Sequence, residues 1–132
     1  MPVTYSIDLD RKVIRTTCTS PLTFADVVGH FRALQQDPLC FGQLDVLLDL
    51  STADLLPESS QLSAVTGELS SIRDKVRFRS CAIVTSRDAM FGMMRMFEAM
   101  ARPYFLAIRV FRVGSEAEAW LTSRQTAGDT EQ

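Results

Sequence analysis

The spacing of apolar residues changes several times along the chain, and each change predicts a new element of secondary structure. Residues 3–7 and 12–20 alternate apolar or β-branched side chains with polar ones, which is typical of two strands joined as a hairpin. Residues 45–50 and 81–84 contain unbroken apolar runs, which favour central strands covered on both faces. Residues 105–113 predict a fifth strand, and its arginines place it near an edge of the sheet.

Four helices are predicted between and after these strands, each with a starting signal. The expected starts are a capping box of Thr23 with Asp26, a first turn containing Pro57 and Glu58, a cap by Ser86 or Asp88, and a second capping box of Ser115 with Glu118. The first helix should end at Asp37, because the residue before proline avoids helical angles. The second should carry a narrow apolar stripe that reaches Val76, and the third should end before Pro103.

The predicted order is therefore ββαβαβαβα, an α/β fold with a mixed, mainly parallel sheet of about five strands and four helices. We expect a single domain over residues 1–125 and a flexible polar tail over 126–132. The unbroken apolar runs predict side chains that are almost fully buried at six positions: Val46, Leu47, Leu48, Ala82, Ile83 and Val84.

The composition limits which kinds of binding and catalysis are expected of this chain. The 132 residues carry a net charge of −2, which argues against binding to nucleic acid or anionic membranes. Three widely spaced cysteines and a single histidine, His30, predict neither a disulfide framework nor a metal site. His30 is expected at the surface, on the edge of the first helix. No leader or membrane span is recognised, no cofactor is expected, and no acid, base and nucleophile converge, so the sequence predicts a non-catalytic cytoplasmic protein.

Two stretches carry a family resemblance: "AMFGMMRMFEAMA" at 89–101 and "IRVFRVGSEAEAWL" at 108–121. Together with the predicted element order, they resemble the SpoIIAA-like (STAS/SEC14-type) family of small bacterial proteins. The resemblance covers roughly residues 3–122 and implies the STAS fold, whose founding members are anti-sigma-factor antagonists. It implies little about biochemistry, because members of this family mostly lack a defined activity.

The resemblance draws attention to Ser59 and Ser60. Antagonist-type STAS domains carry a D-L-S strand end followed by D-S-S-G-L, whose first serine is phosphorylated. The corresponding residues here are Asp49-Leu50-Ser51 and, after a loop longer by one residue, Glu58-Ser59-Ser60-Gln61-Leu62. Ser59 matches the phosphoacceptor position, but both serines also suit the first turn of a helix. With Gln61 in place of the glycine, the sequence favours a STAS-like domain that has lost this switch.

Other candidates lie in the loop before Pro57 and on the methionine-rich third helix. Asp54, Leu55 and Leu56 in that loop are candidates for a ligand or partner surface. One face of the third helix carries methionines, which either pack on the sheet or form an adaptable binding surface. Phe91 on its polar side predicts a dimer contact or the lip of a pocket, and Arg95 is either a ligand anchor or the ion-pair partner of Glu98.

The sequence predicts a regulatory or protein-interaction module, and the alternative is a carrier of a small molecule or lipid. A protein partner or a second copy of the chain is expected, with Phe91 and either Phe105 or Phe111 at a homodimer surface. An interaction module would need an exposed patch at residues 54–62, whereas a carrier would need a closed apolar pocket of a few hundred Å³.

Overall fold

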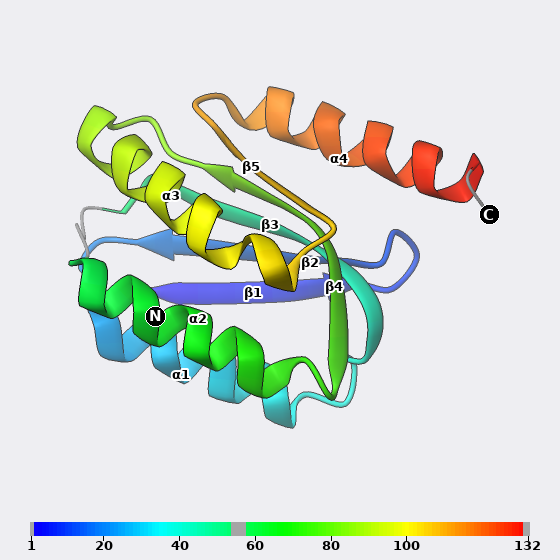
Figure 1. Ribbon diagram of the computed structural model, residues 1–132, viewed down its shortest axis with the longest axis horizontal. Helices are drawn as coiled ribbons and strands as arrows, with labels where there is room; N and C mark the ends of the chain where they lie inside the picture. The colour runs from blue at the N-terminus through cyan, green and yellow to red at the C-terminus, as the bar shows by residue number, and fades with distance from the viewer. Residues whose placement is uncertain (1, 54–57, 131–132) are drawn as a thin grey trace.

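The computed structural model describes residues 2–53 and 58–130 and shows an α/β arrangement (Figure 1). The strands are β1 (Val3–Asp8), β2 (Val13–Thr19), β3 (Gly42–Thr52), β4 (Val76–Val84) and β5 (Ala107–Phe111). The helices are α1 (Phe24–Gln36), α2 (Ser59–Ile72), α3 (Asp88–Ala101), a short 3-10 turn η1 (Arg102–Tyr104) and α4 (Gly114–Thr130). The predicted order of elements and the α/β class are therefore confirmed, and α4 extends into the segment predicted as a tail.

The five strands lie side by side in the same order as in the sequence. β1 pairs antiparallel with β2, and the other neighbours are parallel, so the prediction of a mixed, mainly parallel sheet is confirmed. Parallel neighbours need crossover connections, and these are almost always right-handed. Three successive crossovers in the same direction place α1, α2 and α3 on one face of the sheet, while α4 covers the other (Figure 1).

Several predicted helix boundaries differ from those in the structure. α2 ends at Ile72, and Val76 opens β4 instead of ending the apolar stripe. Arg87 occupies the N-cap position of α3, so neither Ser86 nor Asp88 caps it. α4 begins at Gly114. Glu118, which was expected in a capping box at the start of this helix, therefore lies one turn inside α4.

Polar contacts tie the helices to the rest of the fold. The Lys75 ammonium donates to the backbone carbonyls of Leu34 and Asp37, both at 2.8 Å, so it caps the C-terminus of α1, where a cation is favourable. Glu118 of α4 forms a two-point ion pair with Arg15 of β2, whose second contact measures 3.2 Å.

The buried carboxylate of Asp45 joins three elements on the α4 face of the sheet. It lies at an irregularity in the pairing of β3 with β4, where one oxygen accepts the Ser80 N–H at 3.0 Å. The other oxygen accepts from the side chain of Gln125 on α4 at 2.7 Å. A buried carboxylate needs such partners because losing its hydration is costly. Asp45 therefore fixes α4 against the sheet, a structural role that its position in the sequence did not reveal.

The core confirms half of the burial prediction. Ala82, Ile83 and Val84 of β4 are buried, as expected. Val46, Leu47 and Leu48 of β3 are only half-buried, so for them the prediction of almost full burial is wrong. Leu47 faces α4, whereas Val46 and Leu48 face the three-helix side, where the core is incompletely filled.

The glycines provide the first testable prediction. Gly92 lies within α3, and a Cβ added there would meet no atom within 4 Å. Gly92→Ala should raise the free energy of unfolding by about 0.5–1 kcal/mol, because glycine is the poorer helix former. Chemical denaturation measures the change.

Gly42 supplies the matched control, because a Cβ there would also meet open space but its φ is +71°. Gly42→Ala should lower the free energy of unfolding by roughly 1–2 kcal/mol through the cost of the left-handed conformation. A destabilised Gly92→Ala variant would show that this glycine is required.

Candidate functional site

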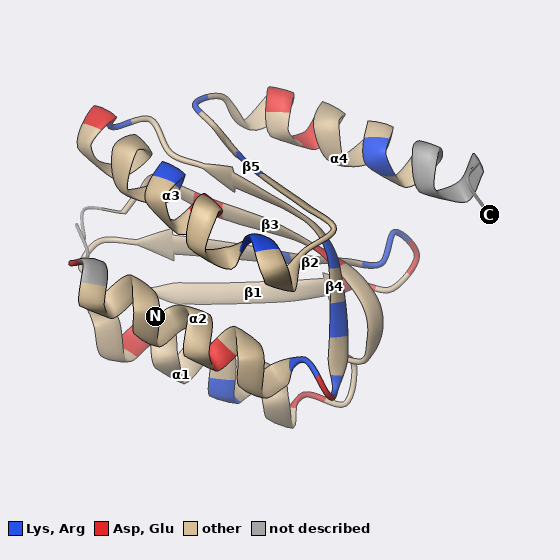
Figure 2. Ribbon diagram, viewed as in Figure 1, with Lys and Arg blue, Asp and Glu red and all other residues tan. Residues whose placement is uncertain are grey.

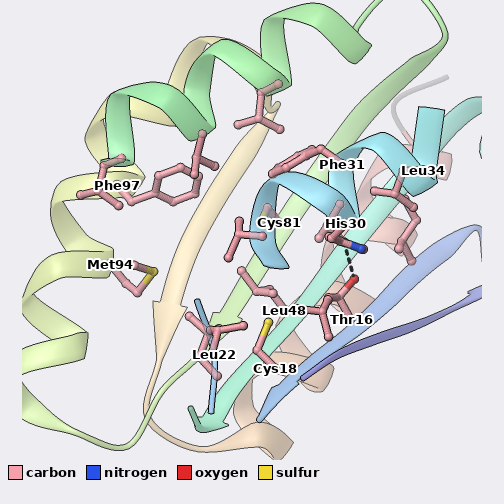
Figure 3. A pocket seen from close by; sticks show the side chains of 18 of the residues that line it. Thr16, Cys18, Leu22, His30, Phe31, Leu34, Leu48, Cys81, Met94 and Phe97 are labelled. Atoms are coloured by element: carbon pink, nitrogen blue, oxygen red, sulfur yellow. Dashed lines mark hydrogen bonds between the residues drawn. The ribbon is translucent and has the colours of Figure 1, made fainter. Parts of the chain in front are cut away.

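An apolar cavity lies between the sheet and the helices α1, α2 and α3 (Figure 3). Its volume is about 130 Å³, and its lining comes from β2, β3 and β4 below and from all three helices above. The lining also includes Leu22, just before α1, Leu62, near the start of α2, and Phe78 of β4. The cavity therefore occupies the centre of the main core.

Short side chains on the sheet explain why this space is left open. Thr16 and Cys18 of β2, Val46 of β3 and Cys81 of β4 all point toward the helices from adjacent strands. On the helix side of the cavity, Phe31 of α1 contributes a larger apolar side chain (Figure 3), and residues of α2 and α3 also line it. Protein interiors are normally close-packed, so a continuous row of short side chains under three helices leaves a void, and Val46 stays half-buried.

Thr16, His30 and Gln61 are polar residues of the otherwise apolar lining, and the first two form a pair. His30 of α1 points down toward the sheet, and its Nε2 lies 3.2 Å from the hydroxyl oxygen of Thr16 on β2 (Figure 3). Its other ring nitrogen, Nδ1, is inaccessible to solvent and has no hydrogen-bond partner among the described residues. The Tyr5 ring of β1 packs edge-on against the imidazole, with ring centroids 5.3 Å apart.

The titratable side chains of the cavity lining, and Tyr5 beside His30, are uncharged near neutral pH. Burial lowers the pKa of His30 to about 4, and burial also raises the pKa of Cys18 to about 11 and that of Cys81 further. A hydrogen bond from Tyr5 to Asp37 raises the pKa of the phenol to about 12. The described lining contains no Lys, Arg, Asp or Glu, so the site is suited to neutral molecules.

The predicted serine sites can be placed only in part. Ser59 and Ser60 are the first two residues of α2, so their predicted position in its first turn is confirmed. Ser60 is exposed, whereas Asp54, Leu55 and Leu56 lie outside the described residues. Glu58 precedes the helix as its N-cap, and its N–H donates to the Gln61 side chain at 2.9 Å. Gln61 thus helps to start α2.

The predicted surface on α3 is engaged within the molecule. Phe91 is half-buried beneath the Arg112 guanidinium, which lies 4.3 Å from its ring centroid. Arg95 forms an ion pair with Glu98 at 3.3 Å. Neither Phe91 nor Arg95 lines the cavity.

The two aromatic residues expected beside Phe91 at a dimer surface are also packed internally. Phe105 stacks on Phe78, and Phe111 is buried against Trp120 beneath α4. Neither forms an exposed aromatic patch with Phe91, so the homodimer prediction loses this basis. Figure 2 shows Lys and Arg positions on several elements, including β4 and the turn that precedes it.

The methionine-rich face of α3 packs on the sheet, which is one of the two interpretations of the sequence given above. Met90, Met94, Phe97 and Ala101 are buried, whereas Met96 is exposed. Met90 and Met94 also line the cavity. Methionine adapts to irregular spaces, so this wall can adjust to an occupant.

Sequence reasoning missed His30 as a site residue, because a lone histidine at the edge of an apolar face was expected at the surface. Its spacing gave a usable signal, since it lies three residues after Val27 and four before Leu34 on the face that packs inward. Thr16 was also detectable, because it alternates with Ile14 and Cys18 on the inner face of β2.

Comparisons of the chain with protein-family models, with curated proteins and with solved structures found no match. The resemblance to the SpoIIAA-like family therefore stays a prediction.

Cys18, Cys40 and Cys81 are buried and unpaired with one another. Among the described residues, no group of metal-binding side chains is assembled. None of the helices within residues 2–53 and 58–130 combines the length and apolar character needed to cross a membrane.

The low pKa of His30 predicts how stability depends on pH. In the unfolded chain this histidine takes up a proton near pH 6.5, whereas in the folded protein it does so only near pH 4. Protonation therefore favours the unfolded chain, and stability falls as pH decreases through this window. Between pH 7 and pH 5, the free energy of unfolding should fall by about 2 kcal/mol from His30 alone.

Urea denaturation of the wild type and of His30→Gln at both pH values isolates this effect. Glutamine keeps a polar group for Thr16 but does not titrate. The carboxylates of Asp37 and Glu118, whose pKa values are lowered by Tyr5 and Arg15, contribute equally to both proteins and cancel. An identical pH dependence in the two proteins would contradict the assigned burial of the imidazole.

Proposed function

We propose that this protein is a non-catalytic binding domain whose central cavity holds a small apolar molecule. The observation that carries the proposal is the cavity itself, which lies between the sheet and three helices and has an almost wholly apolar lining. Ligand sites are typically concave and apolar with few polar groups. Within the described lining, His30 and Thr16 make such a polar pair.

The volume of the cavity limits the size of its occupant. A cavity of about 150 Å³ in another protein binds benzene or xenon, and the cavity here measures about 130 Å³. The alternative considered from sequence was a carrier that needs a few hundred Å³. The smaller volume favours an occupant the size of one ring over a lipid chain.

A SpoIIAA-like regulatory or interaction module is the second candidate. It is supported by the element order and by the position of Ser60, exposed in the first turn of α2, where a phosphate would be tolerated by free backbone N–H groups. Native mass spectrometry of freshly purified protein separates the two candidates. A retained small molecule supports the binding domain. A chain without such a molecule, but with a covalently attached phosphate or a bound protein partner, supports the module.

Toluene is a suitable probe for the binding function. At ten times its dissociation constant, toluene should raise the free energy of unfolding by about 1.4 kcal/mol through mass action. Leu48→Phe fills space from β3 and should weaken toluene binding at least tenfold. NMR titration of methyl signals measures the affinity.

Leu47→Phe is the matched control, because it makes the same change at the neighbouring residue of β3 but on the α4 face of the sheet. Its toluene affinity should stay within about twofold of the wild type, since the cavity is untouched. Equal losses in Leu47→Phe and Leu48→Phe, or no binding to the wild type, would refute the proposed site.

A further inference from the structure

We propose that the cavity is a site for aromatic rings in particular, and that a bound ring lies between the Met94 thioether of α3 and the Cys18 thiol of β2. The inference rests on the proposed binding function and narrows its ligand class from any small apolar molecule to an aromatic one. It comes from the side chains of the lining, many of which carry sulfur or an aromatic ring.

Sulfur reaches the lining from both the sheet and a helix. Cys18 and Cys81 belong to β2 and β4, and Met90 and Met94 belong to α3. In Figure 3, Met94 points into the cavity from α3 and Cys18 points into it from β2. Sulfur interacts favourably with an aromatic ring at a distance of about 5 Å, often at the ring edge. An aromatic ring in this space therefore meets sulfur on two sides.

Both thiols are neutral at pH 7, which suits this kind of contact. Burial raises the pKa of Cys18 to about 11 and that of Cys81 further. An S–H group is only a weak hydrogen-bond donor, so neither cysteine requires a polar group from the ligand. The sulfur atoms thus offer polarisable contacts without charge or strong hydrogen bonds.

Aromatic side chains form much of the remaining lining. Phe31 of α1 and Phe97 of α3 belong to it, and Phe78 and Phe105 stack with their ring centroids 5.4 Å apart. Aromatic rings prefer offset-stacked or edge-to-face neighbours at about 4.5–7 Å. An aromatic ligand can make such contacts with the lining, whereas a saturated ring gains only the dispersion attraction common to all apolar groups.

A soft metal ion is the other ligand that sulfur suggests, and the arrangement argues against it. Thiolate and thioether ligands select ions such as Cu(I). Cys18 and Cys81 lie on strands that are separated by β3, and neighbouring strands are about 4.8 Å apart, so the two thiols are too far apart to share one ion. The described residues assemble no group of metal-binding side chains. The lining therefore favours an aromatic ring.

Benzene and cyclohexane are the matched probes, because both are six-carbon rings without polar atoms and only benzene is aromatic. Their dissociation constants are measured by NMR titration for the wild type and for Met94→Leu, which removes the sulfur at a similar side-chain volume. Met94→Leu should lower the ratio of benzene affinity to cyclohexane affinity roughly 2- to 10-fold, the value of one sulfur–aromatic contact. The different hydration of the two probes is common to both proteins and cancels.

Two further variants separate the effect of sulfur from the shape of the cavity. Met96→Leu makes the same change at an exposed position of α3 outside the lining, so it should leave the ratio unchanged. Leu48→Met introduces sulfur at a lining position of β3, so it should raise the ratio. A ratio that falls in both Met94→Leu and Leu48→Met would assign the effect to shape and overturn the inference.

A measurement on the wild type alone keeps the proposal testable if Met94→Leu does not fold. Intermolecular NOEs should connect the benzene protons with the ε-methyl group of Met94 and with the β protons of Cys18, and they should be absent for Met96. NOEs to other lining residues, but to neither Met94 nor Cys18, would overturn the proposed position of the ring.

The outcomes separate the two levels of the proposal. If neither benzene nor cyclohexane binds, the binding function falls together with this inference. If both bind, but Met94→Leu and Leu48→Met keep the affinity ratio of the wild type, the function stands and the inference is overturned.

Discussion

The handedness of the crossovers between parallel strands is the constraint from which the rest of this structure follows. The strands lie in sequence order, so each crossover moves one place in the same direction. With right-handed connections, α1, α2 and α3 must then share one face of the sheet. The opposite face receives only α4, the last helix, which Asp45 and the Arg15–Glu118 ion pair hold in place.

The three helices packed on one face of the sheet form both the main core and the cavity within it. The helices pack on one another and span the middle strands, while the sheet below them presents Thr16, Cys18 and Cys81. Longer aliphatic side chains at these positions would fill the space and increase stability through added packing. The short side chains therefore leave the cavity at a cost in stability, and stability is commonly lower where a protein binds a ligand.

How much the sequence could predict depends on how local the signal is. The apolar run of β4 and the capping box of Thr23 were sufficient, because the run itself marks a buried central strand and the cap is formed by residues only three apart. The burial of Leu48 was predicted wrongly, because it depends on whether α1 and α2 meet the sheet closely. The site was missed for the same reason: His30 and Thr16 are 14 residues apart and meet only after α1 folds back over β2.

A crystal pressurised with xenon tests the central claim most directly, since xenon enters apolar cavities of this size without needing any particular hydrogen bond. The account predicts a xenon atom between the sheet and the helices, in contact with Leu48, Phe31 and Met94, with little movement of α1. A crystal in which α1 and α2 lie against the sheet, with no xenon and no space for it, would contradict the account.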